Sequence, residues 1–536
     1  MNILAYDIGT TGIKTCLFSL EDGITPLGSE NRGYGLYEVP GGGMEQDADE
    51  WWSAMCETTR ALLEKTGISP LDINGISFCS QMQGLVLVDS EGEPVRRPMS
   101  YMDQRATAQI KKHLAYGPTI AGANVFRLLK CLKATGAVPS SVKDPVWKYK
   151  WVEENEPENF ARVHKWLDVK EYIIARCTGR FVMTEDSAYA TLLYDTHRKE
   201  FSEPLMKMFG VKKEHMPDII RSTDEAGKLL HGPAEELGLA AGTSVFGGGG
   251  DASFIGLGAG CVRPGDTHIY CGTSGWVSTV VPSQMVDTRY MIAAITGADP
   301  NSYNYFAEME TAGKCLEWVK NHLALDEIGV YLDRKDITSS TGMEKTYISL
   351  YDYLTEVIKK APAGSGGVIF TPWLHGNRCP FEDPDAAAMF FGITMNTGKT
   401  ELIRSVIEGI CYHLRWMLEC QDRKTRTSDV IRFVGGGALS DSVCQILADV
   451  TGRTIETVDH PQDAGSVGAA VTAAVGLREI SHLYDTGRLI KPTKVFRPNP
   501  GNRAVYDRCY AVFKELHASN ARGFSALSAI RERTGL

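Results

Sequence analysis

Two short turns of glycine and hydroxyl residues have the composition of phosphate-binding loops. Gly9-Thr10-Thr11-Gly12 follows the strand-like run I-L-A-Y-D-I, and Gly272-Thr273-Ser274-Gly275 follows T-H-I-Y-C in the second half of the chain. In such turns the backbone N–H groups can converge on an anion, and the hydroxyl groups add donors. The repetition predicts two related halves that face one another, each with a phosphate-binding turn. Either turn alone could be an ordinary hairpin.

One carboxylate is the candidate general base. Asp251 follows an apolar run and four glycines, residues 247–250. Glycines let the backbone approach a ligand closely, and an ionised Asp can accept a hydroxyl proton while the oxygen attacks. Because Asp is also common at helix N-termini, the residues alone leave two roles open, a base or a cap of the next helix.

A second acidic residue precedes the first turn. Mg²⁺ prefers oxygen ligands and keeps several waters, so we expect Asp7 to hold Mg²⁺ through water. Lys14 lies on the strand that follows the turn, and we expect it to face either phosphate or solvent.

Strands must position both turns, and the sequence predicts a strand-turn-strand hairpin around each, the first closed at Asp22-Gly23. The 536 residues indicate two to four domains. The net charge of −10 argues against a dedicated binder of nucleic acid or anionic membranes. The thirteen cysteines form no C-x-x-C pair, and the longest near-apolar stretch, 467–477, is too short to cross a bilayer. We therefore expect a cytoplasmic protein with free thiols.

Several segments match one known family in the same order along the chain. They are D-I-G-T-T-G-I-K at the start, P-V-W-K-Y-K-W-V-E-E-N (145–155), G-G-G-D-A-S (248–253), C-G-T-S-G (271–275) and F-V-G-G-G-A-L-S-D (433–441). Together they resemble the FGGY carbohydrate kinases, with most similarity to the xylulokinase-like branch. Lys143 departs from the pattern, because a small or aromatic residue is usual at that position.

The resemblance implies an α/β fold. Two actin/hexokinase-like (ribonuclease H-like) domains, with mixed sheets flanked by helices, would close around a deep cleft. We expect an N-terminal domain over 1–255, a C-terminal domain over 264–480, and an extension over 481–536 with a final helix near 504–518. The glycines around Pro264 are expected to lie in a loop or hinge; they are Gly256, Gly258, Gly260 and Gly265.

The resemblance also implies ATP and Mg²⁺ as cofactors and assigns roles to individual residues. Asp251 would be the base, and Asp441 would cap a helix or reach the nucleotide. The residues implied to hold the phosphates are Gly9, Thr10, Thr11, Thr273 and Ser274, and those implied to line the nucleoside site are Gly313, Gly436, Gly437 and Ala438.

The segments implied to bind substrate depart from the xylulokinase pattern. Met82, Gln83, Tyr101 and Asp103 fall on sugar-contacting positions, with Gln83 in place of His and Tyr101 in place of Trp, while Arg105 is expected to brace Asp103. The predicted acceptor is a ketose such as xylulose, with a polyol or a sugar acid as alternatives. An actin-like ATPase without a sugar substrate is the alternative of another class. No nucleic-acid or membrane partner is expected, and a homodimer is left open.

Three further features have ordinary interpretations. Asp195, Glu310 and the Trp51-Trp52 pair are interpreted as surface or packing residues.

Overall fold

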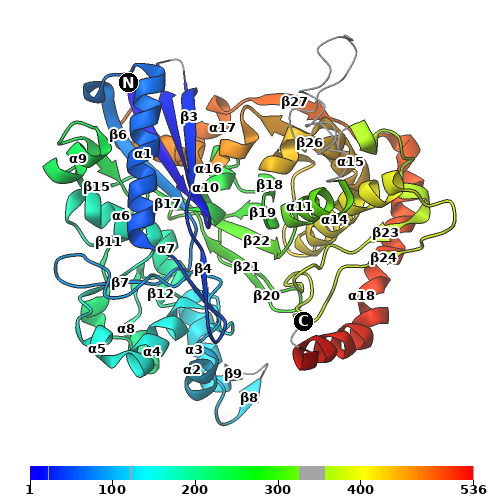
Figure 1. The fold of residues 1–536 in the computed structure, drawn as a ribbon, viewed down its shortest axis with the longest axis horizontal. Coiled ribbons are helices and arrows are strands. Elements are labelled where there is room, and N and C mark those ends of the chain that lie inside the picture. The colour runs from blue at the N-terminus through cyan, green and yellow to red at the C-terminus, as the bar shows by residue number, and fades with distance from the viewer. Residues whose placement is uncertain (22, 121–122, 325–355, 535–536) are drawn as a thin grey trace.

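A computed structural model describes residues 1–21, 23–120, 123–324 and 356–534, and it forms two lobes side by side (Figure 1). The first lobe contains a mixed sheet in the order β15 (Glu225–Lys228), β16 (Ser244–Phe246), β6 (Ile73–Ser80), β1 (Asn2–Ile8), β2 (Gly12–Ser19) and β3 (Thr25–Gly33), with β17 (Gly249–Gly250) also paired to β6. The second lobe contains the order β20 (Val286–Asp287), β21 (Ile292–Thr296), β22 (Tyr303–Met309), β19 (Gly275–Val281), β18 (Thr267–Cys271), β25 (Val430–Val434), β26 (Thr454–Val458) and β27 (Pro492–Phe496).

The two sheets share one motif at their centres. β1 pairs antiparallel with β2 and parallel with β6, and β18 pairs antiparallel with β19 and parallel with β25. Both predicted hairpins are therefore confirmed, and each carries its glycine turn at the same place in its sheet. Asp22, in the turn predicted to close the first hairpin, lies outside the described residues.

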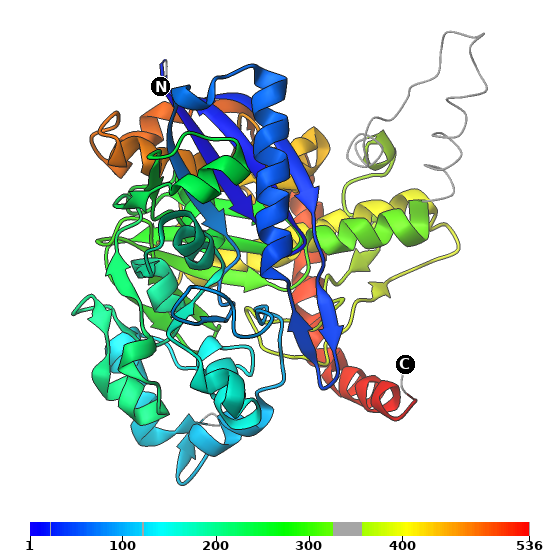
Figure 2. The ribbon, with the colours of Figure 1, turned by 60° about the vertical axis from the view of Figure 1, so that its left-hand side comes forward.

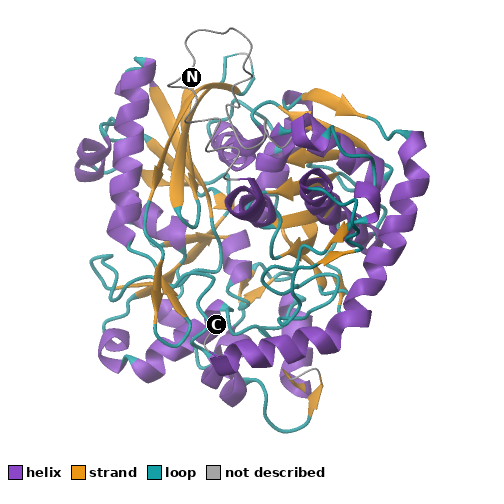
Figure 3. Cartoon of the chain, turned by 45° about the vertical axis from the view of Figure 1, so that its right-hand side comes forward, coloured by secondary structure: helices purple, strands orange, loops and turns teal. Residues whose placement is uncertain are grey.

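The side chains of β1 alternate between two helical layers. Leu4, Tyr6 and Ile8 pack with α1 (Ala48–Thr66), whereas Ile3 and Ala5 pack with α16 (Ala464–Gly476). Successive side chains of a strand point to opposite faces, so a sheet covered on both sides needs apolar residues at consecutive positions. Figure 3 shows helices on both sides of the strands.

Helix α1 has clear start and stop signals. The Asp47 side chain accepts a hydrogen bond from the Asp49 N–H, and Gly67 ends the helix in the left-handed conformation with φ of 68°. Its Trp51 and Trp52 are buried in the first core, so they are packing residues as expected. Asp195 accepts backbone hydrogen bonds from His197 and Arg198 and also has a local structural role.

Two helices lie between the sheets, α10 (Asp251–Gly258) and α16 (Figure 1). The expected loop or hinge is wrong for Gly256 and Gly258, because both lie inside α10. A Cβ at Gly258 would overlap the carbonyl of Ala464, and one at Gly256 would press on the His268 ring. Close packing between α10, α16 and β18 explains these glycines, whereas Gly260 and Gly265 have positive φ in the connection that follows.

The outer face of the second sheet is covered by α11 (Gly313–Val319), α14 (Lys399–Gln421), α15 (Asp441–Thr451) and α18 (Pro500–Thr534). The final helix is longer than expected; it runs along the right-hand edge of the second lobe in Figure 1, and its C-terminal end projects at the bottom of Figure 2. Tyr506, Tyr510 and Phe513 of α18 are buried in the second core, and β27 pairs with β26. The C-terminal extension therefore contributes both a strand and a core helix to the second lobe.

The smaller elements surround these layers. The other α-helices of the described residues are α2 (Thr107–His113), α3 (Val125–Thr135), α4 (Pro145–Asn155), α5 (Pro157–Ala161), α6 (Val169–Thr178), α7 (Glu185–Ala190), α8 (Glu203–Phe209), α9 (His231–Leu237) and α17 (Thr486–Leu489). All thirteen cysteines are unpaired, and eleven of them are buried. Within the described ranges, no helix combines the length and the apolar character needed to span a membrane.

Candidate active site

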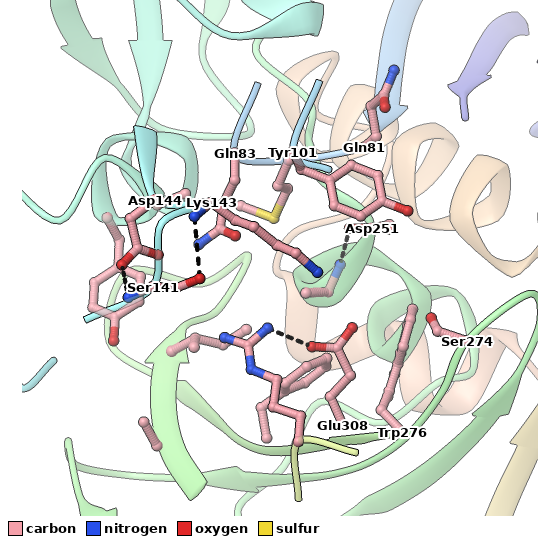
Figure 4. A pocket seen from close by; sticks show the side chains of 18 of the residues that line it. Gln81, Gln83, Tyr101, Ser141, Lys143, Asp144, Asp251, Ser274, Trp276 and Glu308 are labelled. Carbon is pink, nitrogen blue, oxygen red and sulfur yellow. Dashed lines mark hydrogen bonds and ion pairs between the residues drawn. The ribbon is translucent and has the colours of Figure 1, made fainter. Parts of the chain in front are cut away.

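A pocket of about 270 Å³ opens between the two sheets (Figure 4). Its lining comes from both lobes, and it includes Thr10, Gln81, Met82, Gln83, Tyr101, Lys143, Asp144, Asp186, Asp251, Ser274, Trp276, Glu308, Glu310 and Arg378. The predicted residues Thr10, Met82, Gln83, Tyr101, Asp251 and Ser274 thus meet at one cavity.

Strand register explains why residues far apart in the sequence meet there. In the first sheet Ile8 lies beside Ser80, and Ser80 lies beside Gly250. These neighbours are parallel, so the chain leaves all three strands at the same edge of the sheet. This edge of the sheet is therefore where the turn after β1, residues 81–83 and Asp251 all begin.

The first glycine turn is oriented by its carbonyl groups. The carbonyl of Gly9 accepts a hydrogen bond from the Tyr34 hydroxyl at 2.5 Å, that of Thr10 from the Gln46 amide at 2.7 Å, and that of Thr11 from the Tyr34 N–H at 3.0 Å. The N–H groups of Thr10 and Thr11 have no hydrogen-bond partner in the described part of the chain. The turn therefore has two donors available to an anion.

The second turn repeats this arrangement. The Gly272 carbonyl accepts from the Gly313 N–H at 2.7 Å, and the Thr273 carbonyl accepts from the N–H groups of Ala312 and Lys314 at 3.2 Å. The Ser274 carbonyl accepts from the Gly272 N–H at 3.0 Å. Again the two central N–H groups, of Thr273 and Ser274, are without partners among the described residues.

The glycines predicted to line the nucleoside site pack against this second turn. A Cβ at Gly313 would overlap the Gly272 carbonyl, and a Cβ at Gly437 would come within 2.9 Å of the Cys271 Cβ. Gly437 and Ala438 are buried, whereas Gly436 is partly exposed. The packing of this loop therefore requires the small size of Gly313 and Gly437.

The capping role considered for Asp441 is wrong, and its contact with the nucleotide stays a prediction. Ser440 is the residue that caps α15, because its hydroxyl accepts from the Val443 N–H. Asp441 is exposed and forms an ion pair of 2.7 Å with Lys494.

Asp251 is the first residue of α10 and also faces the pocket. Its Oδ1 accepts the Ala252 N–H at 2.8 Å, while Gly250 occupies the cap position. Burial raises the pKa of Asp251 to about 7, and the nearby charges of Asp7 and Glu308 act in the same direction. A carboxyl with this pKa can accept a proton near neutral pH.

Asp7 lies at the end of β1. Burial raises its pKa to about 6, an effect that Lys14 opposes. Lys14 is partly exposed, and its ammonium pairs with Asp463 at 2.6 Å. Among the described residues, no group of three or more His, Cys, Asp or Glu side chains could hold a metal ion by itself. Asp7 therefore fits a magnesium ion that takes most of its oxygens from phosphate and water.

The segments predicted to bind substrate are only partly at the pocket. Asp103 is fully buried and does not line it, because its carboxylate accepts from Arg105 at 2.7 Å and from the Met44 N–H at 2.9 Å. The expected bracing by Arg105 is confirmed. Gln83 lines the pocket with φ of 63°, and its carbonyl accepts from the Lys148 ammonium at 2.7 Å. Burial lowers the pKa of Lys148 to about 8.

Several charged residues of the pocket were missed from the sequence. Glu308 and Glu310 on and after β22 lie two positions apart and both line the pocket, so the interpretation of Glu310 as ordinary surface or packing is wrong. Arg378 reaches the pocket from a distant loop and pairs with Glu308 at 3.1 Å. The alternation in E-M-E (308–310) was the only local sequence signal that two carboxylates line the same side of the pocket. Lys143 and Asp186 also line the pocket.

Two mixed sheets face each other across a pocket lined by Asp251, and each carries a glycine turn with N–H groups available to an anion. This architecture is that of the actin/hexokinase fold class. Sequence comparison identifies the family. The N-terminal domain of the FGGY family of carbohydrate kinases matches residues 2–258, and its C-terminal domain matches residues 268–477. The chain belongs to the FGGY family of carbohydrate kinases.

Individual relatives are similar over nearly the whole chain. A xylulose kinase of Staphylococcus epidermidis is 27% identical over 523 residues, covering 96% of both chains. The crystal structure of a ligand-bound xylulose kinase from Lactobacillus acidophilus has a TM-score of 0.82 at 26% identity and covers 98% of this chain and 99% of its own. A gluconate kinase structure from the same organism has the same TM-score at 25% identity, with the same coverage.

Proposed function

We propose that this carbohydrate kinase transfers the γ-phosphate of Mg·ATP to a hydroxyl of a small ketose such as xylulose, with Asp251 as the general base. The observation that carries the proposal is the matched pair of turns on opposite sides of one pocket. Each turn has two N–H groups without a hydrogen-bond partner among the described residues, and Asp251 lies in the same cavity. The relatives named xylulose kinase support the choice of ketose.

Phosphoryl transfer requires alignment and charge stabilisation more than covalent chemistry. The acceptor oxygen attacks the γ-phosphorus, the bond from that phosphorus to the β,γ-bridging oxygen breaks, and ADP leaves. The hydroxyl proton passes to the carboxylate of Asp251. The N–H groups of the two turns would hold the phosphate oxygens, and Asp7 would hold the magnesium of Mg·ATP through water.

The proposed lobes, residues 1–255 and 264–480, would close on the acceptor. Closure would exclude water, which otherwise competes for the phosphoryl group. The experiment is a panel of ketopentoses, polyols and aldonates, with ADP release measured for each acceptor against an acceptor-free control. We expect at least one ketose to raise ADP release far above that control. ADP release that no acceptor stimulates would favour an actin-like ATPase instead.

Lys143 favours a sugar acid as the second candidate acceptor. Its side chain extends into the pocket (Figure 4), and no hydrogen bond or ion pair joins its ammonium group to any described residue. Arg378, the other cation of the lining, is already paired with Glu308. An unpaired ammonium in a pocket can bind a carboxylate, and a gluconate kinase is among the similar structures.

The variant Lys143→Met separates these two acceptors, because it removes the charge and keeps most of the side-chain volume. If a sugar acid is the substrate, kcat/KM for an aldonate should fall about 10- to 100-fold, as expected for a lost charge-assisted hydrogen bond. The kcat/KM for the corresponding neutral sugar should change little. Equal losses of kcat/KM for both acceptors would show that Lys143 does not distinguish a charged acceptor from a neutral one.

A further inference from the structure

Asp186 connects the helix that carries Asp251 to the rest of the first lobe. It lies on α7, and its side chain is only 2% exposed. Its Oδ2 accepts two hydrogen bonds from the start of α10, one from the Gly250 N–H at 2.8 Å and one from the Ser253 hydroxyl at 2.6 Å. These two donors lie on either side of Asp251 in the sequence.

The other oxygen of the same carboxylate is anchored to its own lobe. Oδ1 accepts from the Ser187 N–H at 2.9 Å and from the Thr184 hydroxyl at 2.5 Å. Thr184 in turn receives a hydrogen bond of 2.6 Å from the ammonium of Lys170, a fully buried residue. Both oxygens are therefore satisfied, and the carboxylate has little freedom to move.

The backbone before Asp251 gains no rigidity from its own side chains, because residues 247–250 are all glycine. Gly250 leaves space that Met82 fills, since a Cβ there would overlap the Met82 thioether. Glycines are the most flexible residues of a chain. The orientation of the Asp251 side chain therefore depends on contacts that other segments make with this part of the backbone. Asp186 supplies two of them at the first turn of α10.

We propose that Asp186 is a positioning residue that holds the first turn of α10 so that Asp251 faces the acceptor hydroxyl. The inference rests on the proposed role of Asp251 as the base. A misplacement of about 1 Å can lower the rate of an oriented reaction about 100-fold. The loss of this anchor should therefore affect turnover much more than nucleotide binding.

Asp186→Asn is the first test, because it keeps the shape and replaces one acceptor oxygen by an NH₂ donor. An amide cannot accept from all four donors that now point at the carboxylate. We expect kcat to fall about 10- to 100-fold, with KM for Mg·ATP within about twofold of the wild-type value. Asp195→Asn is the matched control, since Asp195 also accepts two backbone N–H groups but does not line the pocket.

A double-mutant cycle distinguishes positioning from a merely structural role. If Asp186 acts through Asp251, then Asp186→Asn should lower the residual kcat of Asp251→Asn by no more than about twofold. Ser253→Ala removes one of the two bonds to α10 with little structural change, and it should show the same non-additivity with a smaller loss. If Asp186→Asn does not fold, the positioning role is tested with Ser253→Ala instead.

The outcomes are distinguishable. Equal losses in the wild-type and Asp251→Asn backgrounds, or an unchanged kcat in both single variants, would overturn the positioning role alone. A wild-type enzyme that phosphorylates no acceptor would overturn the proposed function, and the positioning role with it.

Discussion

The raised pKa of Asp251 predicts how the rate depends on pH. Burial, together with the charges of Asp7 and Glu308, raises this pKa to about 7. A raised pKa means that the protonated form, which cannot accept a proton, persists to a higher pH. With a pKa of about 7, the ionised fraction is about one-tenth at pH 6, one-half at pH 7 and nine-tenths at pH 8. We therefore expect kcat/KM for the acceptor to rise about tenfold from pH 6 to pH 8.

The assay is ADP release at limiting acceptor and saturating Mg·ATP, because kcat/KM then reports the enzyme before the acceptor binds. Glu308→Gln provides an internal test, since it removes one of the charges that raise the pKa of Asp251. In this variant the acid limb of the profile should move to lower pH, whatever happens to the maximal rate. A profile that is flat between pH 6 and pH 8, or a limb that Glu308→Gln leaves in place, would refute the reasoning.

Three further changes test the packing and electrostatics of the site. Gly313→Ala places a methyl group against the Gly272 carbonyl and should raise KM for ATP at least about tenfold in steady-state kinetics. Gly258→Ala places a Cβ against Ala464 and should lower the free energy of unfolding in urea by about 1–3 kcal/mol, whereas Gly232→Ala, with nothing within 4 Å of its Cβ, should not. The pKa of Asp251 is raised in the folded state, so its ionised carboxylate destabilises the fold above pH 7. Asp251→Asn should therefore increase the free energy of unfolding at pH 8 by up to about 4 kcal/mol, and this gain should shrink toward pH 4.

The local features of the site could be predicted because their signals are contiguous. Each glycine turn follows a strand-like run and begins another, so both hairpins follow from about fifteen residues of sequence. Asp251 could be found in the same way, because four glycines precede it. Arg105 is only two residues from Asp103, and their ion pair was also predicted.

The remaining features depend on contacts between distant segments. Arg378 meets Glu308 although 70 residues separate them in the sequence. Lys14 pairs with Asp463, which lies 449 residues away in the sequence. Gly258 resembled a hinge residue, but its small size is required by Ala464 of α16, some two hundred residues later in the sequence. Sequence spacing could not reveal any of these partners.

The role of Asp251 is tested most directly by comparing Mg·ATP binding and acceptor phosphorylation in Asp251→Asn and the wild type. Isothermal titration gives the affinity, and single-turnover measurement of the sugar phosphate gives the chemical step. We expect the variant to bind Mg·ATP within about twofold of the wild type and to phosphorylate the acceptor about 10²- to 10⁴-fold more slowly, the usual range for a lost general base. A variant that forms sugar phosphate at the wild-type rate would contradict the assignment of Asp251 as the base.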